Sequence, residues 1–129
     1  MSRIIGIDLG TTNSLVAAVE SGIPMVIADA EGQRITPSAV HYPALGEPPV
    51  VGMAAQRVRA LHPAETFYSV KRFMGRRGGD ITAQECRMAY TVNAGEADPV
   101  SFQLQGQPVS PEDVSAEILR KTLRQVAPR

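Results

Sequence analysis

The first 28 residues constrain the fold of this sequence most, because three short apolar segments follow one another with only tight turns between them. Residues 3–9 are nearly continuous in apolar and β-branched side chains, and residues 14–20 and 23–28 form two more such segments. The turn-forming groups Gly10 to Asn13 and Ser21-Gly22 separate them. Connections this short join antiparallel strands. The sequence therefore predicts an antiparallel β-meander, with residues 3–9 as a strand buried on both faces.

The end of the sequence predicts one long amphipathic helix. Ser110 is a suitable N-cap, Pro111 fits the first helical position, and Glu112-Asp113 put negative charge in the first turn. Pro128-Arg129 is expected to end the helix. Its apolar stripe consists of Val114, Ile118, Leu119, Leu123 and Val126. Such a helix needs a sheet to cover its apolar face, and we expect that sheet to be the N-terminal meander.

Residues 39–109 are expected to form a mixed insertion between the meander and the helix. The expected elements are strands at 39–42, 49–51 and 100–104 and helices at 53–61 and 67–75. His62-Pro63 ends the first helix, because the residue before proline avoids the helical region, and Gly75 closes the second. The side chains expected to share one face are Ala54, Val58 and Leu61 in the first helix and Val100, Phe102 and Leu104 in the last strand.

The fold class predicted from these elements is α/β. Residues 1–38 and 110–129 are expected to form one lobe, in which the last helix returns to the first sheet. Residues 39–109 are expected to form an inserted upper subdomain. No internal repeat or low-complexity tract suggests a different organisation.

Composition argues against several functional classes. Thirteen basic and thirteen acidic side chains cancel, so no overall field attracts nucleic acid or an anionic membrane. The single cysteine, Cys86, cannot form an internal disulfide, and no Cys/His spacing suggests zinc. His41 and His62 are therefore interpreted as ordinary packing or surface residues. Asp8 interrupts the first apolar run well before it could span a bilayer, and we expect a cytoplasmic protein.

Asp8 stands in the first predicted strand, directly before the turn Gly10-Thr11-Thr12-Asn13. Burial of an unpaired carboxylate is costly, so Asp8 must have a partner or lie at an open strand end. In one interpretation Asp8 accepts hydrogen bonds from the N–H groups of Gly10 to Thr12. In the other, these N–H groups and the two threonine hydroxyls hold phosphate oxygens, while Asp8 holds Mg²⁺ through water. Spacing alone favours the first interpretation, because similar turns join strands in many proteins.

Several ordered motifs resemble one family. The segment IIGIDLGTTNSLVA, residues 4–17, resembles the first phosphate-binding loop of the seventy-kilodalton heat-shock chaperones, the DnaK-like family. This family belongs to the superfamily of actin, sugar-kinase and chaperone ATPases, which shares the D-x-G-T hairpin. Further similar motifs follow in the order expected for the family: AEGQRITPS at 30–38, VG at 51–52, SVKRFMGR at 69–76 and VSAEILRKT at 114–122. Residues 78–108 match only in their pattern of strands and turns.

The resemblance implies part of an actin-like (ribonuclease H-like) ATPase lobe, with the inserted α+β subdomain. Asp8 resembles the family's aspartate that holds Mg²⁺ through coordinated water. Gly10, Thr11, Thr12 and Asn13 resemble the hairpin that holds the phosphates of ATP or ADP. Lys71 resembles the catalytic lysine that reaches the terminal phosphate and its attacking water. In such a site the protein orients water and neutralises charge during phosphoryl transfer.

The resemblance also implies a longer parent chain. The family's second phosphate loop, second magnesium-side aspartate, catalytic glutamate and adenosine pocket have no counterpart here. We therefore expect an N-terminal piece that alone neither hydrolyses ATP nor binds it tightly, and whose exposed sheet edge would allow copies to associate. Partners implied for the parent chain are unfolded polypeptides, a J-domain co-chaperone and a nucleotide-exchange factor, in protein folding and stress response. Neither nucleic acid nor membrane is an expected partner.

Other readings share part of the pattern. A sugar or glycerol kinase and a bacterial actin-like filament ATPase would both carry a D-x-G-T turn. The segments at 30–38 and 69–75 favour the chaperone branch over these two. A small binding module complete at this length is disfavoured by the unaccompanied last helix. A housekeeping chaperone and a specialised one, for example for iron–sulfur assembly, are both compatible with the sequence.

Overall fold

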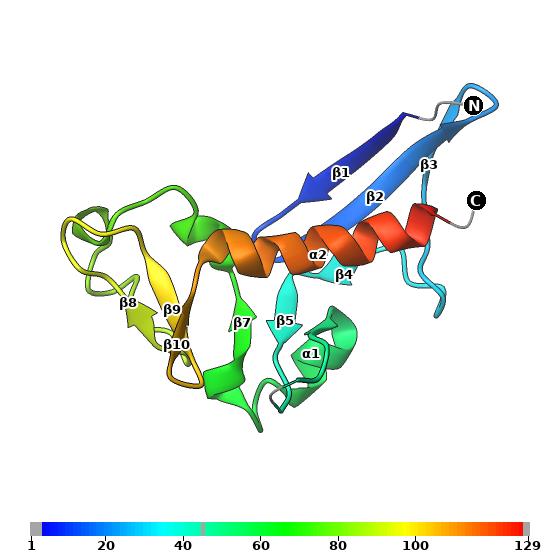
Figure 1. Cartoon of the computed structure of the whole chain (residues 1–129). Coiled ribbons are helices and arrows are strands. Elements are labelled where there is room, and N and C mark those ends of the chain that lie inside the picture. The colour runs from blue at the N-terminus through cyan, green and yellow to red at the C-terminus, as the bar shows by residue number, and fades with distance from the viewer. Residues whose placement is uncertain (1–3, 45, 128–129) are drawn as a thin grey trace.

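The computed structural model describes residues 4–44 and 46–127, which form three small antiparallel sheets joined by one long helix (Figure 1). The elements in chain order are β1 (Ile5–Leu9), β2 (Asn13–Glu20), β3 (Ile23–Val26), β4 (Thr36–Pro37), β5 (Ala39–His41), β6 (Val50–Val51), α1 (Met53–Val58), η1 (Pro63–Glu65), β7 (Thr66–Tyr68), η2 (Val70–Phe73), η3 (Gly78–Asp80), β8 (Val92–Asn93), β9 (Ser101–Leu104), β10 (Gln107–Val109) and α2 (Pro111–Val126), where η marks a 3₁₀ helix. Residue 3 and Pro128-Arg129, for which the sequence predicted a strand start and a helix stop, lie outside the described residues.

The predicted meander is confirmed. β2 pairs antiparallel with β1 on one side and with β3 on the other, and β4 pairs with the first two residues of β2. Ile7 lies opposite Val16, and Met25 lies opposite Ala18. The third strand ends at Val26, before the predicted end. Ile27 leaves the strand to become buried, although its N–H still donates to the Val16 carbonyl.

The prediction that the first strand is buried on both faces is wrong. β1 alternates between half-buried side chains, Ile5, Ile7 and Leu9, and the exposed residues Gly6 and Asp8. It is an edge strand, and within the described residues only the sheet face toward α2 is well covered. A continuous apolar run predicts burial on both faces only when a second layer of structure is present.

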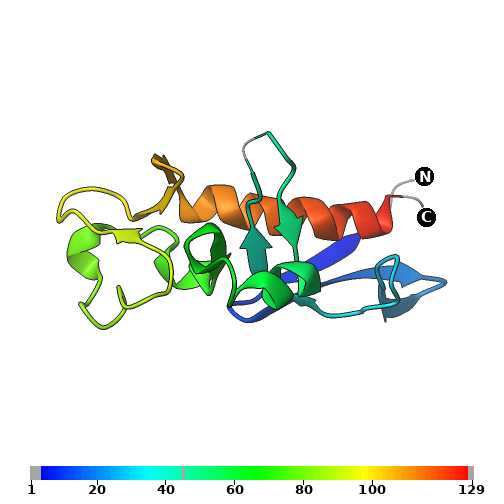
Figure 2. The same cartoon turned by 90° about the horizontal axis from the view of Figure 1, so that it is seen from below.

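α2 is the predicted C-terminal helix. It packs against both hydrophobic cores, the larger aromatic core described below and the smaller core under the meander. The Ser110 side chain accepts from the Asp113 N–H, and the Asp113 carboxylate accepts from the Ser110 N–H, which is a capping box. Val114 and Ile118 belong to the larger core, whereas Val126 packs on the meander. Seen from below, α2 runs along most of the molecule, from the β8–β9–β10 sheet to the meander (Figure 2).

One member of the predicted apolar stripe of α2 faces outward. Leu123 is 47% exposed, and the neighbouring Thr122 is fully buried in its place. The buried row advances by four residues at each step, through Val114, Ile118, Thr122 and Val126. The Thr122 hydroxyl donates to the Leu119 carbonyl, so its polar atom is satisfied inside the core.

The larger core is aromatic and lies between α2 and the two smaller sheets. Phe67, Tyr90 and Phe102 contact one another with ring centroids 5.0–5.3 Å apart, and Phe73 meets Phe102 edge to face. The predicted alternation in β9 and the residue before it is confirmed, since Val100 and Phe102 are buried and Leu104 packs against the same core. The Tyr90 hydroxyl donates to the Tyr68 carbonyl, which satisfies its polar end.

The helix predicted at 53–61 is shorter than expected, and a different face of it is buried. α1 ends at Val58, and the N–H groups of Leu61 and His62 both bond to the Val58 carbonyl in tight turns. Ala55 is the buried residue of the helix, whereas Ala54 is exposed and Leu61 is 77% exposed. A helix of six residues is too short for its apolar period to identify the buried face.

The helix predicted at 67–75 is wrong in its first half. Phe67 lies in β7, where it pairs with Val40 of β5. Ser69 has a left-handed φ of 56°, which turns the chain from β7 into η2. Gly75 follows η2 with φ 72°, as expected for a glycine that closes a helical turn. The aromatic side chains at 67 and 68 follow the strand preference because β5 provides a partner.

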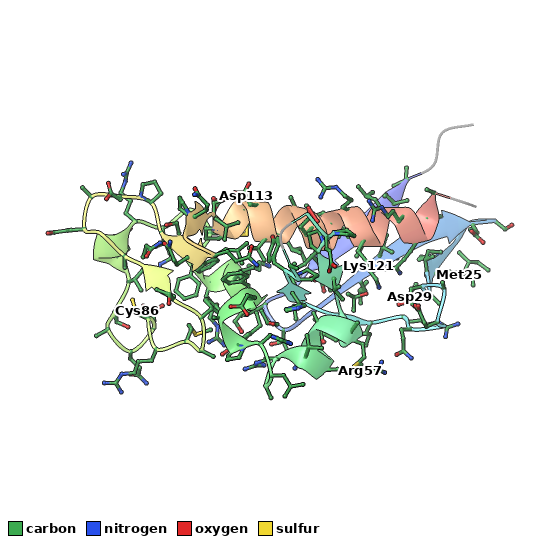
Figure 3. The ribbon with its side chains drawn as sticks, turned by 60° about the horizontal axis from the view of Figure 1, so that its bottom comes forward. Met25, Asp29, Arg57, Cys86, Asp113 and Lys121 are labelled. Carbon is green, nitrogen blue, oxygen red and sulfur yellow. The ribbon has the colours of Figure 1, made fainter. Side chains whose placement is uncertain are left out.

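A partly buried ion pair connects the segment after β3 to α2. The Lys121 ammonium donates to Asp29 Oδ2 at 3.0 Å and to Thr36 Oγ1 at 2.7 Å. Asp29 Oδ1 in turn accepts from the N–H groups of Glu31 and Gln33. Figure 3 shows Asp29 and Lys121 beside one another, between α2 and the loop. The pair therefore holds the loop that leads into β4 in place.

The stability that the Asp29 carboxylate contributes is expected to decrease at acidic pH. Burial raises the pKa of the Asp29 carboxyl, but the Gln33 N–H, the Lys121 ammonium and the Glu31 N–H together bring it below its ordinary value of 3.8. A pKa lowered by folding adds stability above the ordinary value, and this stability is lost as pH falls through the folded-state pKa. Urea unfolding from neutral pH downward should show a smaller acid loss for Asp29→Asn than for the unchanged chain. An identical acid loss in both would contradict the assignment.

Among the described residues, no helix has both the length and the apolar composition needed to cross a bilayer.

Candidate functional site

Two buried serines, Ser14 and Ser38, support the turn between β1 and β2 through hydrogen bonds. Ser38, which follows β4, donates its hydroxyl hydrogen to the Gly10 carbonyl at 2.8 Å, and its N–H donates to the Thr12 carbonyl at 2.8 Å. Its hydroxyl oxygen lies 2.8 Å from Ser14 Oγ. Because a hydroxyl has one hydrogen, Ser14 must be the donor in this last contact. Three hydrogen bonds to Ser38 thus fix the Gly10 and Thr12 carbonyls of the turn and the start of β2.

Ser14 and Ser38 are site residues that the sequence reasoning did not identify. They are only 1% and 4% exposed, and they lie 24 residues apart in the chain. The sequence offered a weak signal, since the segment at 30–38 was one of the motifs of the family resemblance. No local pattern predicts that a serine after β4 forms hydrogen bonds with the turn after β1.

Gly10 is required by close packing inside the turn. A Cβ built on Gly10 would lie 2.2 Å from the Asn13 carbonyl oxygen, far inside van der Waals contact. The clash is with backbone, so a larger residue could enter only if the turn opened. The close packing of the turn therefore requires glycine at position 10, whether or not a ligand binds.

Asp8, Thr11 and Thr12 remain available at the surface of this turn. Asp8 is exposed, and its carboxylate makes no hydrogen bond or ion pair with any other described residue. The interpretation in which Asp8 accepts from the N–H groups of Gly10 to Thr12 is therefore wrong. The hydroxyls of the half-buried Thr11 and the exposed Thr12 also make no hydrogen bond within the described residues, and Asn13 is exposed beside them.

Lys71 lies on a separate element. It is exposed on η2, between Val70 and Phe73, which are 3% and 2% exposed and anchor η2 in the aromatic core. Leu9, the residue before the turn, packs against that same core. No hydrogen bond or ion pair joins Lys71 to Asp8 or to the turn within the described residues. The structure thus unites Asp8 and residues 10–13 on one hairpin and anchors both the hairpin and η2 on one core.

The free carboxylate and hydroxyl groups of the hairpin suit a magnesium ion bound together with phosphate better than a metal ion alone. Mg²⁺ prefers oxygen ligands and keeps several waters, so one free carboxylate beside two free hydroxyls is a suitable set. Within residues 4–44 and 46–127, no group of three or more His, Cys, Asp or Glu side chains is arranged to hold a metal by itself. Asp8 would therefore hold Mg²⁺ only together with water and a phosphate.

Removal of the Ser38 hydroxyl tests the support of the turn. Ser38→Ala leaves the buried Ser14 hydroxyl and the Gly10 carbonyl without partners, and we expect a loss of about 1–3 kcal/mol in unfolding free energy. The double variant Ser14→Ala/Ser38→Ala should lose less than the sum of the two single losses, because it leaves no orphaned hydroxyl. Denaturant unfolding of all four proteins completes the cycle. Strictly additive losses would show that the two serines act independently.

Gly10→Ala tests the close packing of the turn. The added methyl group must displace the Asn13 carbonyl, and we expect a loss of about 1–3 kcal/mol in unfolding free energy. Gly6→Ala, in the strand β1 that leads into the turn, is the control because a Cβ there meets no atom within 4 Å. Denaturant unfolding should separate the two variants clearly. Equal losses would mean that the clash at residue 10 relaxes without cost.

Comparison with known proteins agrees with the motifs. A family model described as "Hsp70 protein" matches residues 4–128. The chaperone protein DnaK of Deinococcus radiodurans is 47% identical over 121 residues, which are 94% of this chain and 19% of that protein. The chaperone protein dnaK3 of Synechocystis sp. is 49% identical over 123 residues, or 94% of this chain and 16% of that protein. The chain thus spans less than a fifth of the length of these relatives. With the family model matched from residue 4 to residue 128, and with an α/β fold of meander and returning helix that suits part of an ATPase lobe, the chain belongs to the Hsp70 protein family.

Proposed function

We propose that this chain supplies one wall of a Mg²⁺–ATP site in an ATP-dependent molecular chaperone. The observation that carries the proposal is the β1–β2 hairpin of this Hsp70 family member. Hydrogen bonds to Ser38 fix its turn, while the side chains of Asp8, Thr11 and Thr12 have no partner among the described residues. A rigid turn with free donors beside a free carboxylate is suited to hold phosphate and its cation, because its groups need not reorganise when the ligand binds.

Each residue of the wall has a distinct role in this proposal. Thr11 and Thr12, with the backbone of Gly10 to Asn13, bind phosphate oxygens, and Asp8 holds Mg²⁺ through water. Mg²⁺ neutralises phosphate charge when it is bound. Lys71 brings a positive charge to the terminal phosphate and orients the attacking water. Val70 and Phe73 keep Lys71 in position, because both are buried in the aromatic core.

The proposal extends to the complete protein. The relatives are named chaperone proteins, and we infer that the complete protein couples ATP hydrolysis to the binding and release of unfolded polypeptides in the cytoplasm. A J-domain co-chaperone and a nucleotide-exchange factor are the proposed regulators of the cycle.

The test is ATP turnover by the complete protein, with and without an extended apolar peptide. We expect slow turnover that depends on Mg²⁺ and that the peptide accelerates. Parallel reactions with glycerol or a hexose, and a sedimentation assay for filaments, provide the controls. Turnover that ignores peptide but requires a sugar, or that follows polymerisation, would keep the phosphate-binding hairpin and refute the chaperone function.

A further inference from the structure

The two histidines of the chain meet in space, although 20 residues separate them in the sequence. His41 ends β5, and His62 precedes η1. Their ring centroids are 5.2 Å apart, with the ring planes inclined by 35°. Both rings line a surface pocket of about 340 Å³, together with Tyr42, Glu65 and Gln105. The sequence had suggested ordinary packing or surface residues, and it gave no sign that the two rings contact one another.

A buried threonine selects which nitrogen of the neutral His41 ring carries the hydrogen. The Thr66 hydroxyl is fully buried and donates its hydrogen to the His62 carbonyl at 2.8 Å. The His41 Nδ1 atom lies 3.0 Å from the same hydroxyl oxygen. Since the hydroxyl hydrogen is already used, Nδ1 must carry the hydrogen of this contact. In the neutral ring the lone pair then lies on Nε2, which is the arrangement of a metal-binding histidine with a hydrogen-bonded outer nitrogen.

We propose that His41 and His62 form a binding site for Zn²⁺, with water completing the coordination. Two imidazoles on one tetrahedral Zn²⁺, with Zn–N distances of about 2.0–2.1 Å, hold their ring centroids roughly 5 Å apart, close to the observed separation. Imidazole suits zinc, and among the described residues the pocket lining includes the acidic Glu65 and no lysine or arginine. This site shares no residue with the proposed nucleotide wall.

Glu65 increases the preference of the pocket for a cation. It ends the 3₁₀ helix η1, three residues after His62, and residues at this spacing lie on the same side of a 3₁₀ turn. Within the described residues, no three His, Cys, Asp or Glu side chains form a ready-made metal cluster, so Glu65 is assigned an electrostatic role and not that of a ligand. Glu65→Gln is accordingly expected to weaken zinc binding less than the loss of either histidine.

The test is calorimetric titration of the chain with ZnCl₂ near neutral pH. Cys86→Ser is used as the background, so that the single thiol cannot bind the metal. We expect one Zn²⁺ per chain and an affinity that falls at least about tenfold in both His41→Ala and His62→Ala, because each removes half of a chelating pair. Gln105→Ala, which alters the lining without removing an imidazole, should bind as the background does. His62 is exposed, so His62→Ala decides the outcome if His41→Ala does not fold.

Two results would overturn the site. One is zinc binding that keeps its affinity in either single variant with a reduced stoichiometry, which shows independent histidines. The other is binding by the background no tighter than by the variant that lacks both histidines. Nitrogen NMR of the imidazoles adds a structural readout, since both rings should shift together and saturate at one equivalent of Zn²⁺.

Thr66→Val tests the positioning role of the threonine. We expect the metal-free His41 ring to lose its preference for hydrogen on Nδ1, which nitrogen chemical shifts report directly. Zinc affinity should fall about 10-fold or more, the range found for outer partners of metal-binding histidines. Thr66→Ser, which restores the hydroxyl, should recover both properties. An unchanged tautomer in Thr66→Val would refute this role.

Discussion

ATP turnover by the complete protein is expected to fall about 10²–10³-fold when Lys71 is replaced by alanine, the range found when one preorganised donor is removed from a reacting centre. The side chain of Lys71 is exposed and has no partner within the described residues, whereas its neighbours Val70 and Phe73 anchor η2 in the core. The substitution should therefore change the unfolding free energy of this chain by no more than about 0.5 kcal/mol. Turnover and denaturant unfolding measure the two effects separately.

Arg72→Ala is the matched control for Lys71→Ala. Arg72 is the next residue of the same 3₁₀ helix, and it is also basic and exposed. If general positive charge near the site were sufficient, both variants would lose turnover to a similar degree. We expect Arg72→Ala to retain turnover within about threefold, as for a surface substitution away from the reacting centre. Normal turnover in Lys71→Ala would remove Lys71 from the proposed catalytic role.

The largest loss of stability is expected at Phe67. This side chain is fully buried and contacts the rings of Tyr42, Tyr90 and Phe102 at centroid distances of 5.8, 5.0 and 5.3 Å. Replacement by alanine removes these contacts and leaves a cavity, for which about 3–5 kcal/mol of unfolding free energy is the usual loss. Because a domain is stable by only about 5–15 kcal/mol in total, the variant should be unfolded at much lower denaturant concentration.

Leu61→Ala provides the control for Phe67→Ala. Leu61 is 77% exposed, so its removal should change the unfolding free energy by about 0.5 kcal/mol or less. The sequence pattern alone had placed Leu61 on the buried face of a helix, so the comparison also tests the fold. A large loss at Leu61 together with a small loss at Phe67 would contradict the position of the core.

The meander and the last helix could be predicted from local patterns in the sequence. The strands that become β1 to β3 are separated by turns too short for anything but antiparallel pairing. The helix α2 is defined by the Ser110 cap, the proline after it and a long apolar period. These signals are local, because each turn or cap is built from residues within a few positions of one another. The ordered motifs also predicted the family and the hairpin of Asp8 and residues 10–13 as its candidate site.

Which faces are buried, and which distant groups contact one another, depends on packing between separate elements and could not be predicted from local patterns. Thr122 replaces Leu123 in the buried row of α2, and residues 66–68 become a strand because β5 lies beside them. Ser38 reaches Gly10 and Ser14, and His41 meets His62, through contacts between residues 20 or more positions apart. Burial and hydrogen bonds of this kind depend on how separate elements pack. The same local pattern is compatible with several packings, so the sequence pattern alone does not select among them.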